Sequence, residues 1–432
     1  MIKTIVLTEQ NNVASVYDNE KIITDLIIER GTYKIGDIYI GIVETILSSI
    51  NAAFIKLDCL ENNGFIHVKN LGHLRKKHNN NNISQHLICN SIVLVQILKA
   101  PTGNKGPTVT GEIFLRGRYL NVLPFEESIT FCKDFGNPEE MLYFKTLFSL
   151  LKTRSVGIVI NKTALNTNIK NVIQDFYTLL YDWDNICKNI NLKPPPFLIS
   201  GNDNFISKVL QKLYTDKVNH ILVDSHKGSK KVASIITRWA KKKKSSLSIK
   251  YFKRYDFSIR DYNLDLIISD LLHSRINLVG GGYIVIEKTE ALTTIDVNSG
   301  SFNYLNSPRR TGILINRKAA KQIARHIKLR NISGIIIIDF IDMEKQEDQL
   351  QLLIYLDSLL KQDQENPRII QFSELGLVEL TRKRQSRTLK EVFYSQPQSF
   401  FNSNSGSCIT KIISNYCIGH SVFFETFYTY SL

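Results

Sequence analysis

The sequence predicts an α+β protein built from several units. Its 432 residues are too many for one simple core, and a hydrophobic share of 43% excludes wholesale disorder. Short apolar segments between residues 36 and 99 follow one another at the spacing of a small β-barrel. Between residues 197 and 275, strand-like and helix-like segments alternate instead. Together these observations predict roughly two to four units of mixed structure.

The charge of the chain narrows the classes of partner. Its 55 basic and 40 acidic residues give a net charge of +15. This excess favours a polyanionic partner, either nucleic acid or an anionic membrane surface. No run of about 18 apolar residues exists, so no integral membrane insertion is expected. No strongly amphipathic basic helix supports a peripheral membrane protein, which makes that alternative the weaker one.

The N-terminus and the cysteines carry little targeting or redox information. The first residues are not a signal peptide and are too acidic and strand-like for a transit peptide, so we expect the protein to work where it is made. Six cysteines occur without a Cys-x-x-Cys motif, which predicts neither a disulfide framework nor a standard zinc site. A metal cluster of Cys408, Cys417 and His420 is an open alternative, although its spacing differs from the usual sites.

The N-terminal third of the chain is predicted to be rich in strands. Three short strands are expected at residues 3–7, 13–17 and 25–29, and they are too few to bury a core alone, so they should pair with a later segment. The strands of the predicted barrel cover residues 36–46, 49–57, 64–68 and 91–99.

Two helices in the C-terminal half have clear apolar faces. The helix at 316–330 places alanines and isoleucines on one face and basic residues on the rest. The helix at 345–361 is expected to bury five apolar side chains, namely Leu350, Leu353, Ile354, Leu356 and Leu360.

The stretch that carries chemistry runs from Gly280 to Asp342 and includes the first of these two helices. It holds two apolar strands that each end in acid, the first at Asp296 and the second at Asp339. Four consecutive isoleucines, 335 to 338, suit a strand buried on both faces. The three glycines at 280–282 are not a phosphate-binding loop, because no Gly-Lys-Ser follows them, and a tight turn explains them.

Two carboxylates at neighbouring strand ends can share one hard cation. Mg²⁺ takes one or two protein carboxylates and completes its shell with water and phosphate oxygens. Structural roles remain open for each acid taken alone. Asp339 or Asp342 can cap the helix that follows, and Asp296 can shape the Asn-Ser-Gly turn after it.

Four segments in this region resemble a known family. Thr-Glu-Ala-Leu-Thr-Thr-Ile-Asp-Val-Asn-Ser at 289–299, the helix at 316–325, Ile-Ile-Asp-Phe-Ile-Asp-Met at 337–343 and Gly-Leu-Val-Glu-Leu-Thr-Arg-Lys-Arg at 376–384 are similar, in this order, to the RNase E/G family of endoribonucleases. The separation of Asp296 and Asp339 also fits the family. The resemblance covers roughly residues 1 to 390.

The resemblance implies a specific domain order. Residues 1–34 and 215–278 would form an RNase H-like subdomain, interrupted by an S1 domain of the OB-fold type at 35–124 and a 5′-sensor region at 125–214. Residues 279–400 would form a DNase I-like catalytic subdomain, and residues 401–432 would be a C-terminal tail.

The resemblance also implies an activity. The family hydrolyses single-stranded, often A/U-rich RNA with Mg²⁺, leaves a 5′-phosphate and a 3′-hydroxyl, and acts in RNA processing and decay, rRNA processing included. Asp296 and Asp339 would hold Mg²⁺, and Asn298 would orient Asp296 or the attacking water. The barrel would hold the RNA strand beside the metal.

Further residues match the family's RNA contacts. Phe54 and Phe65 would stack on bases, although ordinary barrel-core positions remain an alternative for both. A phosphate contact is implied for Lys105. The run of Arg382, Lys383 and Arg384 would touch the RNA backbone near the scissile bond.

The chain departs from the family pattern at two places. The family grips the 5′-monophosphate with Arg-Thr, where this chain has Asn161 and Lys162, or Lys162 and Thr163 after a shift of one residue. Because lysine lacks the bidentate fork of arginine, we expect weaker 5′-end sensing, and Lys162 can instead be a solvated loop lysine. The family's Cys-Pro-x-Cys is missing after residue 384, so zinc and a zinc-linked dimer are in doubt, while a homo-oligomer of another kind remains open.

A second function class is a non-catalytic RNA-binding factor with an S1 domain. Such a protein would use the basic charge and the barrel but would need neither aspartate. Abundant Asn, Ile and Lys are typical of AT-rich genomes such as those of plastids. We therefore expect location in the chloroplast stroma if the gene is organellar, and in the cytoplasm otherwise.

Overall fold

The computed structural model describes residues 3–394, apart from 10, 59–62, 76–81, 102–104, 133–134, 137, 153–154, 166, 191–192, 202–204, 216, 240–246, 253–261, 263, 301–307, 344, 364 and 385. The chain forms two compact units. The N-terminal unit comprises Met1–Asp256 with Gln385–Arg387, and the C-terminal unit comprises Phe257–Arg384 with Thr388–Leu432. Among the described residues, no helix is long and apolar enough to cross a membrane.

A five-stranded sheet with the order β15-β14-β1-β2-β3 forms one part of the N-terminal unit. Its strands are β1 (Lys3–Thr8), β2 (Val13–Tyr17), β3 (Ile23–Ile28), β14 (Val218–Val223) and β15 (Ser248–Tyr251). The first three are antiparallel, whereas β1 runs parallel to β14 and β14 runs parallel to β15. This pairing confirms that the first strands need a later segment. The helices α3 (Phe205–Leu213) and α4 (His226–Trp239) share its buried core, so α3 belongs with this sheet rather than with the predicted sensor region.

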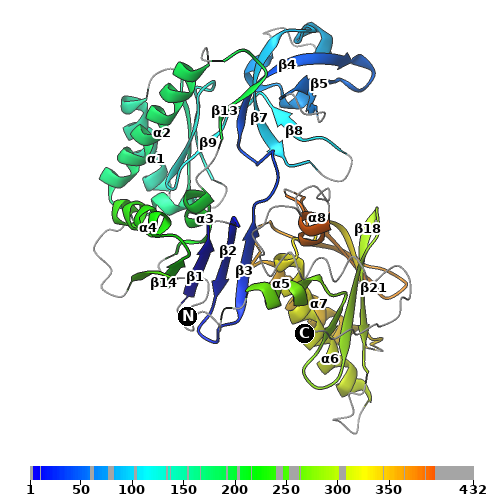
Figure 1. The fold of residues 1–432 in the computed structure, drawn as a ribbon. Helices are drawn as coiled ribbons and strands as arrows, with labels where there is room; N and C mark the ends of the chain where they lie inside the picture. Colours follow the sequence, from blue (N-terminus) through cyan, green and yellow to red (C-terminus); the bar gives the residue numbers. More distant parts are fainter. Residues whose placement is uncertain are drawn as a thin grey trace, which may run out of the picture. The chain divides into compact units, whose positions relative to one another are not determined.

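A closed five-stranded barrel forms the second part (Figure 1). It contains β4 (Ile38–Leu47), β5 (Ala52–Lys56), β6 (Gly64–His67), β7 (Ile92–Lys99) and β8 (Thr108–Thr110), and the pairing of β4 with β7 closes it. The predicted small β-barrel is thereby confirmed. An additional strand, β13 (Phe197–Ser200), pairs with β4, although the sequence placed it in the sensor region.

A third part of the N-terminal unit is a sheet with the order β11-β12-β10-β9. Its strands are β9 (Leu115–Arg116), β10 (Leu120–Leu123), β11 (Ile129–Phe131) and β12 (Gly157–Ile160). The helices α1 (Pro138–Leu151) and α2 (Ile169–Asn189) share its core. Val172, Phe176 and Leu179 of α2 are buried there, so the apolar stripe of this helix packs in the core.

The C-terminal unit is built on a six-stranded sheet with the order β16-β17-β18-β19-β21-β20. These strands are β16 (Arg275–Asn277), β17 (Tyr283–Lys288), β18 (Leu292–Asn298), β19 (Gly334–Asp339), β20 (Arg368–Phe372) and β21 (Leu377–Arg382). Its helices are α5 (Leu264–Leu272), α6 (Pro308–Leu329), α7 (Gln346–Leu360) and α8 (Leu389–Tyr394). Only β18 and β19 are parallel, and every other pair is antiparallel.

Residue 279, where the catalytic subdomain is expected to start, lies inside the C-terminal unit. Two elements of this unit precede that residue: the helix α5 and the short strand β16, which pairs with β17 as an outer strand of the C-terminal sheet.

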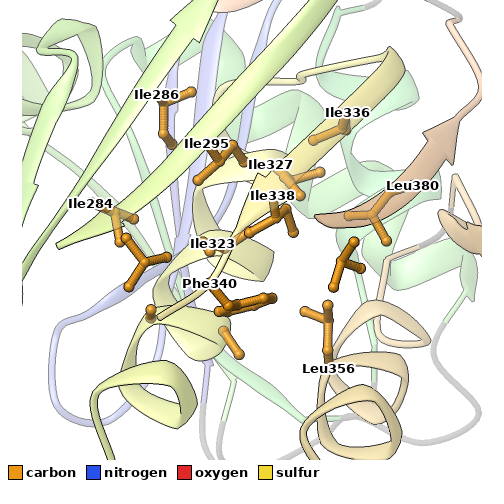
Figure 2. Close-up of a cluster of buried hydrophobic side chains, with 14 of the residues drawn as sticks. Ile284, Ile286, Ile295, Ile323, Ile327, Ile336, Ile338, Phe340, Leu356 and Leu380 are labelled. Atoms are coloured by element: carbon orange, nitrogen blue, oxygen red, sulfur yellow. The ribbon is translucent and has the colours of Figure 1, made fainter. Parts of the chain in front are cut away.

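Helices cover one face of the C-terminal sheet. Alternate residues of its strands, such as Ile284, Ile295 and Ile338, point into a core shared with α6 and α7 (Figure 2). The opposite face, which we call the open face, carries the intervening residues. Ile336 and Ile338 are fully buried, but Ile335 is 51% exposed and Ile337 is partly exposed. The prediction that all four isoleucines are buried on both faces was therefore wrong, because β19 lies in a mixed sheet with one covered face.

The helix α6 meets the core as predicted, and α7 does so only in part. Ala319, Ala320 and Ile323 of α6 are completely buried. On α7 the core-facing residues follow one another at a spacing of four: Leu352, Leu356 and Leu360. In contrast, the side chains of Leu350 and Ile354 are 60% and 62% exposed. Leu350 and Ile354 precede the core-facing positions by two residues, which turns them away from the sheet.

The glycines at 280–282 form the tight turn between β16 and β17, as expected. Gly280 and Gly281 have φ angles of 110° and 113°, which residues with a Cβ rarely adopt. The amide of Gly281 donates to the carbonyl of Leu278, and the amide of Leu278 donates to the carbonyl of Gly282. This turn fixes the register of the hairpin.

A histidine and an arginine are buried together near the end of α6. His326 and Arg330 are 8% and 4% exposed, and Nε of Arg330 donates to Nδ1 of His326 at 3.0 Å. Burial, with the charges of Arg330 and Arg325, lowers the pKa of His326 from 6.5 to about 3. The imidazole is therefore neutral in the folded protein, and Nε2 carries its proton.

Acidification is expected to destabilise the fold through His326. In the unfolded chain its pKa returns to about 6.5, so the unfolded state binds one more proton below that pH. The contribution of His326 to the free energy of unfolding is complete above pH 6.5. It should be smaller by about 2 kcal/mol at pH 5. Urea unfolding followed by circular dichroism at pH 7.5, 6 and 5 measures it. His326→Gln, which keeps a neutral acceptor, should lack this part of the pH dependence, and an identical slope in both proteins would contradict the assignment.

Candidate active site

Asp296 and Asp339 lie side by side at the ends of the two parallel strands. They are direct register partners in the β18–β19 pairing. Both follow a core-facing isoleucine, Ile295 and Ile338, so both side chains project from the open face. Neighbouring strands are roughly 4.8 Å apart, which brings the two carboxylates within reach of a single cation. The sequence placed these acids at strand ends, and the sheet brings the ends together.

Two further polar residues complete this cluster. Asn298 is the last residue of β18, and its Nδ2 donates to Oδ2 of Asp296 at 2.6 Å. The amide therefore holds the Asp296 carboxylate in one orientation. Asp342 follows β19 and is exposed, and its charge acts on Asp339.

The electrostatics of the cluster favour a cation. Partial burial and the charges of Asp296 and Asp342 raise the pKa of Asp339. In the described part of the chain, none of these three carboxylates has an Arg or Lys ion-pair partner. A divalent cation would relieve this repulsion. Oxygen donors from two carboxylates fit Mg²⁺, which keeps several waters and binds substrate phosphates.

The donor set does not suit a fully protein-enclosed metal. Within the described residues, no group of three or more His, Cys, Asp or Glu side chains is placed to hold a metal ion. A cation at this place would therefore take two carboxylates from the protein and fill its other coordination positions with water or ligand oxygens.

An arginine and a tyrosine on the same open face were missed by the sequence analysis. The guanidinium carbon of Arg275 lies 3.8 Å from the ring centroid of Tyr283, which is the register partner of Asn298. The glycine turn at 280–282 was the available signal, because a hairpin around it places these two residues on one face.

The barrel places its two predicted stacking residues together. Phe54 and Phe65 are register partners on β5 and β6, their ring centroids are 5.8 Å apart, and both are partly exposed. Neither is therefore an enclosed core residue. Lys105 is exposed next to the start of β8. Partly exposed rings can stack on bases, and an exposed lysine can contact a phosphate.

The three basic residues at the end of β21 do not share one environment. Arg382 is 4% exposed; its Nε donates to Oδ2 of Asp363 at 2.7 Å, and its Nη1 donates to Asn331 and Ile332. This burial contradicts the prediction that Arg382 contacts RNA, since residue 382 follows Val378 and Leu380 on the covered face. Lys383 and Arg384 are exposed, and Arg384 pairs with Glu391 at 2.7 Å.

The predicted 5′-sensing residues lie in a short helical turn, Lys162–Ala164, after β12. Lys162 is exposed, and the hydroxyl of Thr163 already donates to the carbonyl of Arg118. The side-chain oxygen of Asn161 is also occupied, because Oδ1 accepts a hydrogen bond from Nδ2 of Asn121 at 2.8 Å. Of these three residues, Lys162 alone is exposed without a side-chain hydrogen bond to another described residue.

The candidate cluster of Cys408, Cys417 and His420 lies outside the described residues, and so does the predicted tail at 401–432.

Comparisons with known proteins agree with the four matched segments. The model of the ribonuclease E/G family matches residues 114–385. The chain is 40% identical to "Ribonuclease E" of Synechocystis over 394 residues, which cover 91% of this chain and 58% of that protein. It is 38% identical to "Ribonuclease E/G-like protein" of Pyropia yezoensis over 403 residues, 93% of this chain and 79% of that one. To "Ribonuclease G" of Escherichia coli it is 27% identical over 390 residues, 88% and 79% of the two chains.

The chain thus spans somewhat more than half the length of the cyanobacterial relative, and most of its own length takes part in every one of these matches. The family model and the relatives above 30% identity lead to the same assignment: this chain belongs to the ribonuclease E/G family.

Proposed function

We propose that the protein is a Mg²⁺-dependent endoribonuclease that cuts single-stranded RNA. The observation that carries this proposal is the in-register pair of Asp296 and Asp339 on an open sheet face, without a cationic partner among the described residues. Membership of the ribonuclease E/G family supports the same function. A Mg²⁺ ion here would lower the pKa of a bound water and stabilise charge on the phosphoryl oxygens.

The residues of the chain have separate tasks in this proposal. Asp296 and Asp339 hold the ion, and Asn298 keeps the Asp296 carboxylate oriented through its 2.6 Å hydrogen bond. Phe54 and Phe65 stack on bases of the strand, and Lys105 takes a phosphate. The products then carry a 5′-phosphate and a 3′-hydroxyl. We extend the proposal to A/U-rich sites in RNA processing and decay, including that of rRNA.

The subdomain assignments are part of the same proposal. The N-terminal sheet, with three antiparallel strands followed by two strands parallel to β1, supports an RNase H-like subdomain. The closed barrel supports an S1 domain. The mixed sheet of the C-terminal unit supports a DNase I-like catalytic subdomain. The bias toward Asn, Ile and Lys supports location in the plastid.

A direct cleavage assay tests the proposal. The full chain is incubated with an end-labelled, single-stranded A/U-rich RNA, once with Mg²⁺ and once with EDTA. We expect internal cuts only with Mg²⁺, restored when excess Mg²⁺ is added to the EDTA sample. Cleavage that persists in EDTA would contradict the role of the metal. Tight RNA binding without cleavage in Mg²⁺ would instead favour the alternative, a non-catalytic RNA-binding factor that uses the barrel alone.

A further inference from the structure

The open face of the C-terminal sheet has a cation placed in line with the two aspartates. Arg275 is the register partner of Val285, Val285 of Asp296, and Asp296 of Asp339. Register partners on adjacent strands point to the same face, so these four side chains form one row across the sheet. Arg275 stands two strands from Asp296, which corresponds to roughly 10 Å.

The guanidinium of Arg275 is held in a defined position. It lies over the ring of Tyr283 at 3.8 Å, and its Nε donates to Oδ1 of Asn277 at 3.4 Å. Its two terminal nitrogens have no acceptor within the described part of the chain. Stacking fixes the plane of the guanidinium while leaving its outer edge free for an anion that offers two oxygen acceptors.

The open face around Arg275 carries acidic rather than basic side chains. The open-face positions of β16 to β19 are all described, and Arg275 is the only cationic residue among them. The same strands present Glu287, Asp296 and Asp339 on this face. A polyanion that approaches the two aspartates is repelled by these acids, so a fixed cation beside them would decide where the strand can lie.

We propose that Arg275, held by Tyr283, binds a backbone phosphate of single-stranded RNA next to the phosphate that is cut. This site rests on the proposed function of Asp296 and Asp339, and it adds to it a phosphate subsite on the outer hairpin of the sheet. Arg275 acts by binding and positioning the strand rather than on the reacting atoms. Phosphate is the ligand because an arginine edge matches two phosphate oxygens, and the flat stacked pair leaves that edge outward.

The test separates binding from cleavage. Affinity of the full chain for a short single-stranded RNA is measured by fluorescence anisotropy in EDTA, where no cleavage is expected, at several salt concentrations. Arg275→Ala should weaken binding about tenfold, the effect of losing one charge-assisted hydrogen-bond pair. The slope of log affinity against log salt should become shallower by about 0.7, because one phosphate contact is lost.

Two further variants keep the result interpretable. Arg275→Lys retains the charge but not the stacked fork, so it should keep the salt slope and lose only part of the affinity. Lys361→Ala is the matched control: it removes one exposed positive charge, 76% exposed, at the end of α7 on the covered side of the sheet. It should bind like the wild type.

Kinetics with Mg²⁺ complete the experiment. Arg275→Ala should raise KM about tenfold and leave kcat within about twofold of wild type, because a positioning phosphate contact acts mainly on ground-state binding. Unchanged affinity and salt slope in EDTA would overturn the proposal, as would a loss confined to kcat. If the wild type fails to cleave RNA at all, the proposed function fails, while the binding comparison in EDTA still decides whether this phosphate site exists.

Discussion

Replacing Asp339 by asparagine is expected to slow RNA cleavage by about a thousandfold or more while RNA binding changes little. Asparagine has nearly the same shape as aspartate but lacks its negative charge, so the ion loses one of two carboxylates that hold it. A bound metal supplies several kcal/mol of transition-state stabilisation, and about 4 kcal/mol corresponds to a thousandfold in rate. Asp296→Asn should have the same effect, since both residues occupy one register row.

Glu379→Gln is the matched control for these variants. Glu379 is the register partner of Ile337, one row away from the two aspartates on the same face. Removal of its charge should leave cleavage close to the wild-type rate. Single-turnover cleavage of a labelled RNA, together with its affinity in EDTA, measures both properties. Wild-type cleavage by either aspartate variant with Mg²⁺ would end the active-site assignment.

The second large effect is expected for the buried ion pair between Arg382 at the end of β21 and Asp363. Asp363→Asn leaves the guanidinium of Arg382 in the interior without its anionic partner, whose oxygens lie 2.7 and 3.4 Å away. Breaking a buried ion pair from one side costs about 3–5 kcal/mol, because the remaining charge is desolvated and unpaired. The free energy of unfolding should therefore fall by about this amount, as measured by urea unfolding at neutral pH.

A neighbouring arginine provides the comparison. Arg384→Ala removes a partner of Glu391 from an ion pair in which the arginine side chain is 40% exposed. Exposed pairs contribute at most about 1 kcal/mol, so this variant should unfold close to the wild type. If Asp363→Asn and Arg384→Ala lowered the free energy of unfolding by the same amount, burial of the Arg382–Asp363 pair would not be the cause of the loss.

The strand-end aspartates show what the sequence could predict. Asp296 and Asp339 each follow a short apolar run, and a strand that ends in acid is recognisable without a structure. That they share a row depended on the parallel pairing of β18 with β19. The family resemblance implied only that the two acids hold one ion, and periodicity alone did not require their strands to pair.

Other features depended on tertiary context that local patterns do not contain. Ile335 and Ile336 are chemically identical, yet one is half exposed and the other fully buried, because helices cover a single face of the sheet. Arg382 and Arg384 belong to one basic run, and only the strand register sends the first inward to Asp363. Arg275 contacts Tyr283 because β16 and β17 pair as an antiparallel hairpin. In each case the deciding partner is distant in sequence or on another strand.

The two left-handed glycines between β16 and β17 have a consequence for how this protein can vary. Side chains alternate strictly along a strand, so one inserted residue in that reversal would flip the whole of β16. Arg275 would then face the helices, and Ile276 would face water. The length of the turn at residues 278–282 thereby sets which charge β16 shows to a bound polymer.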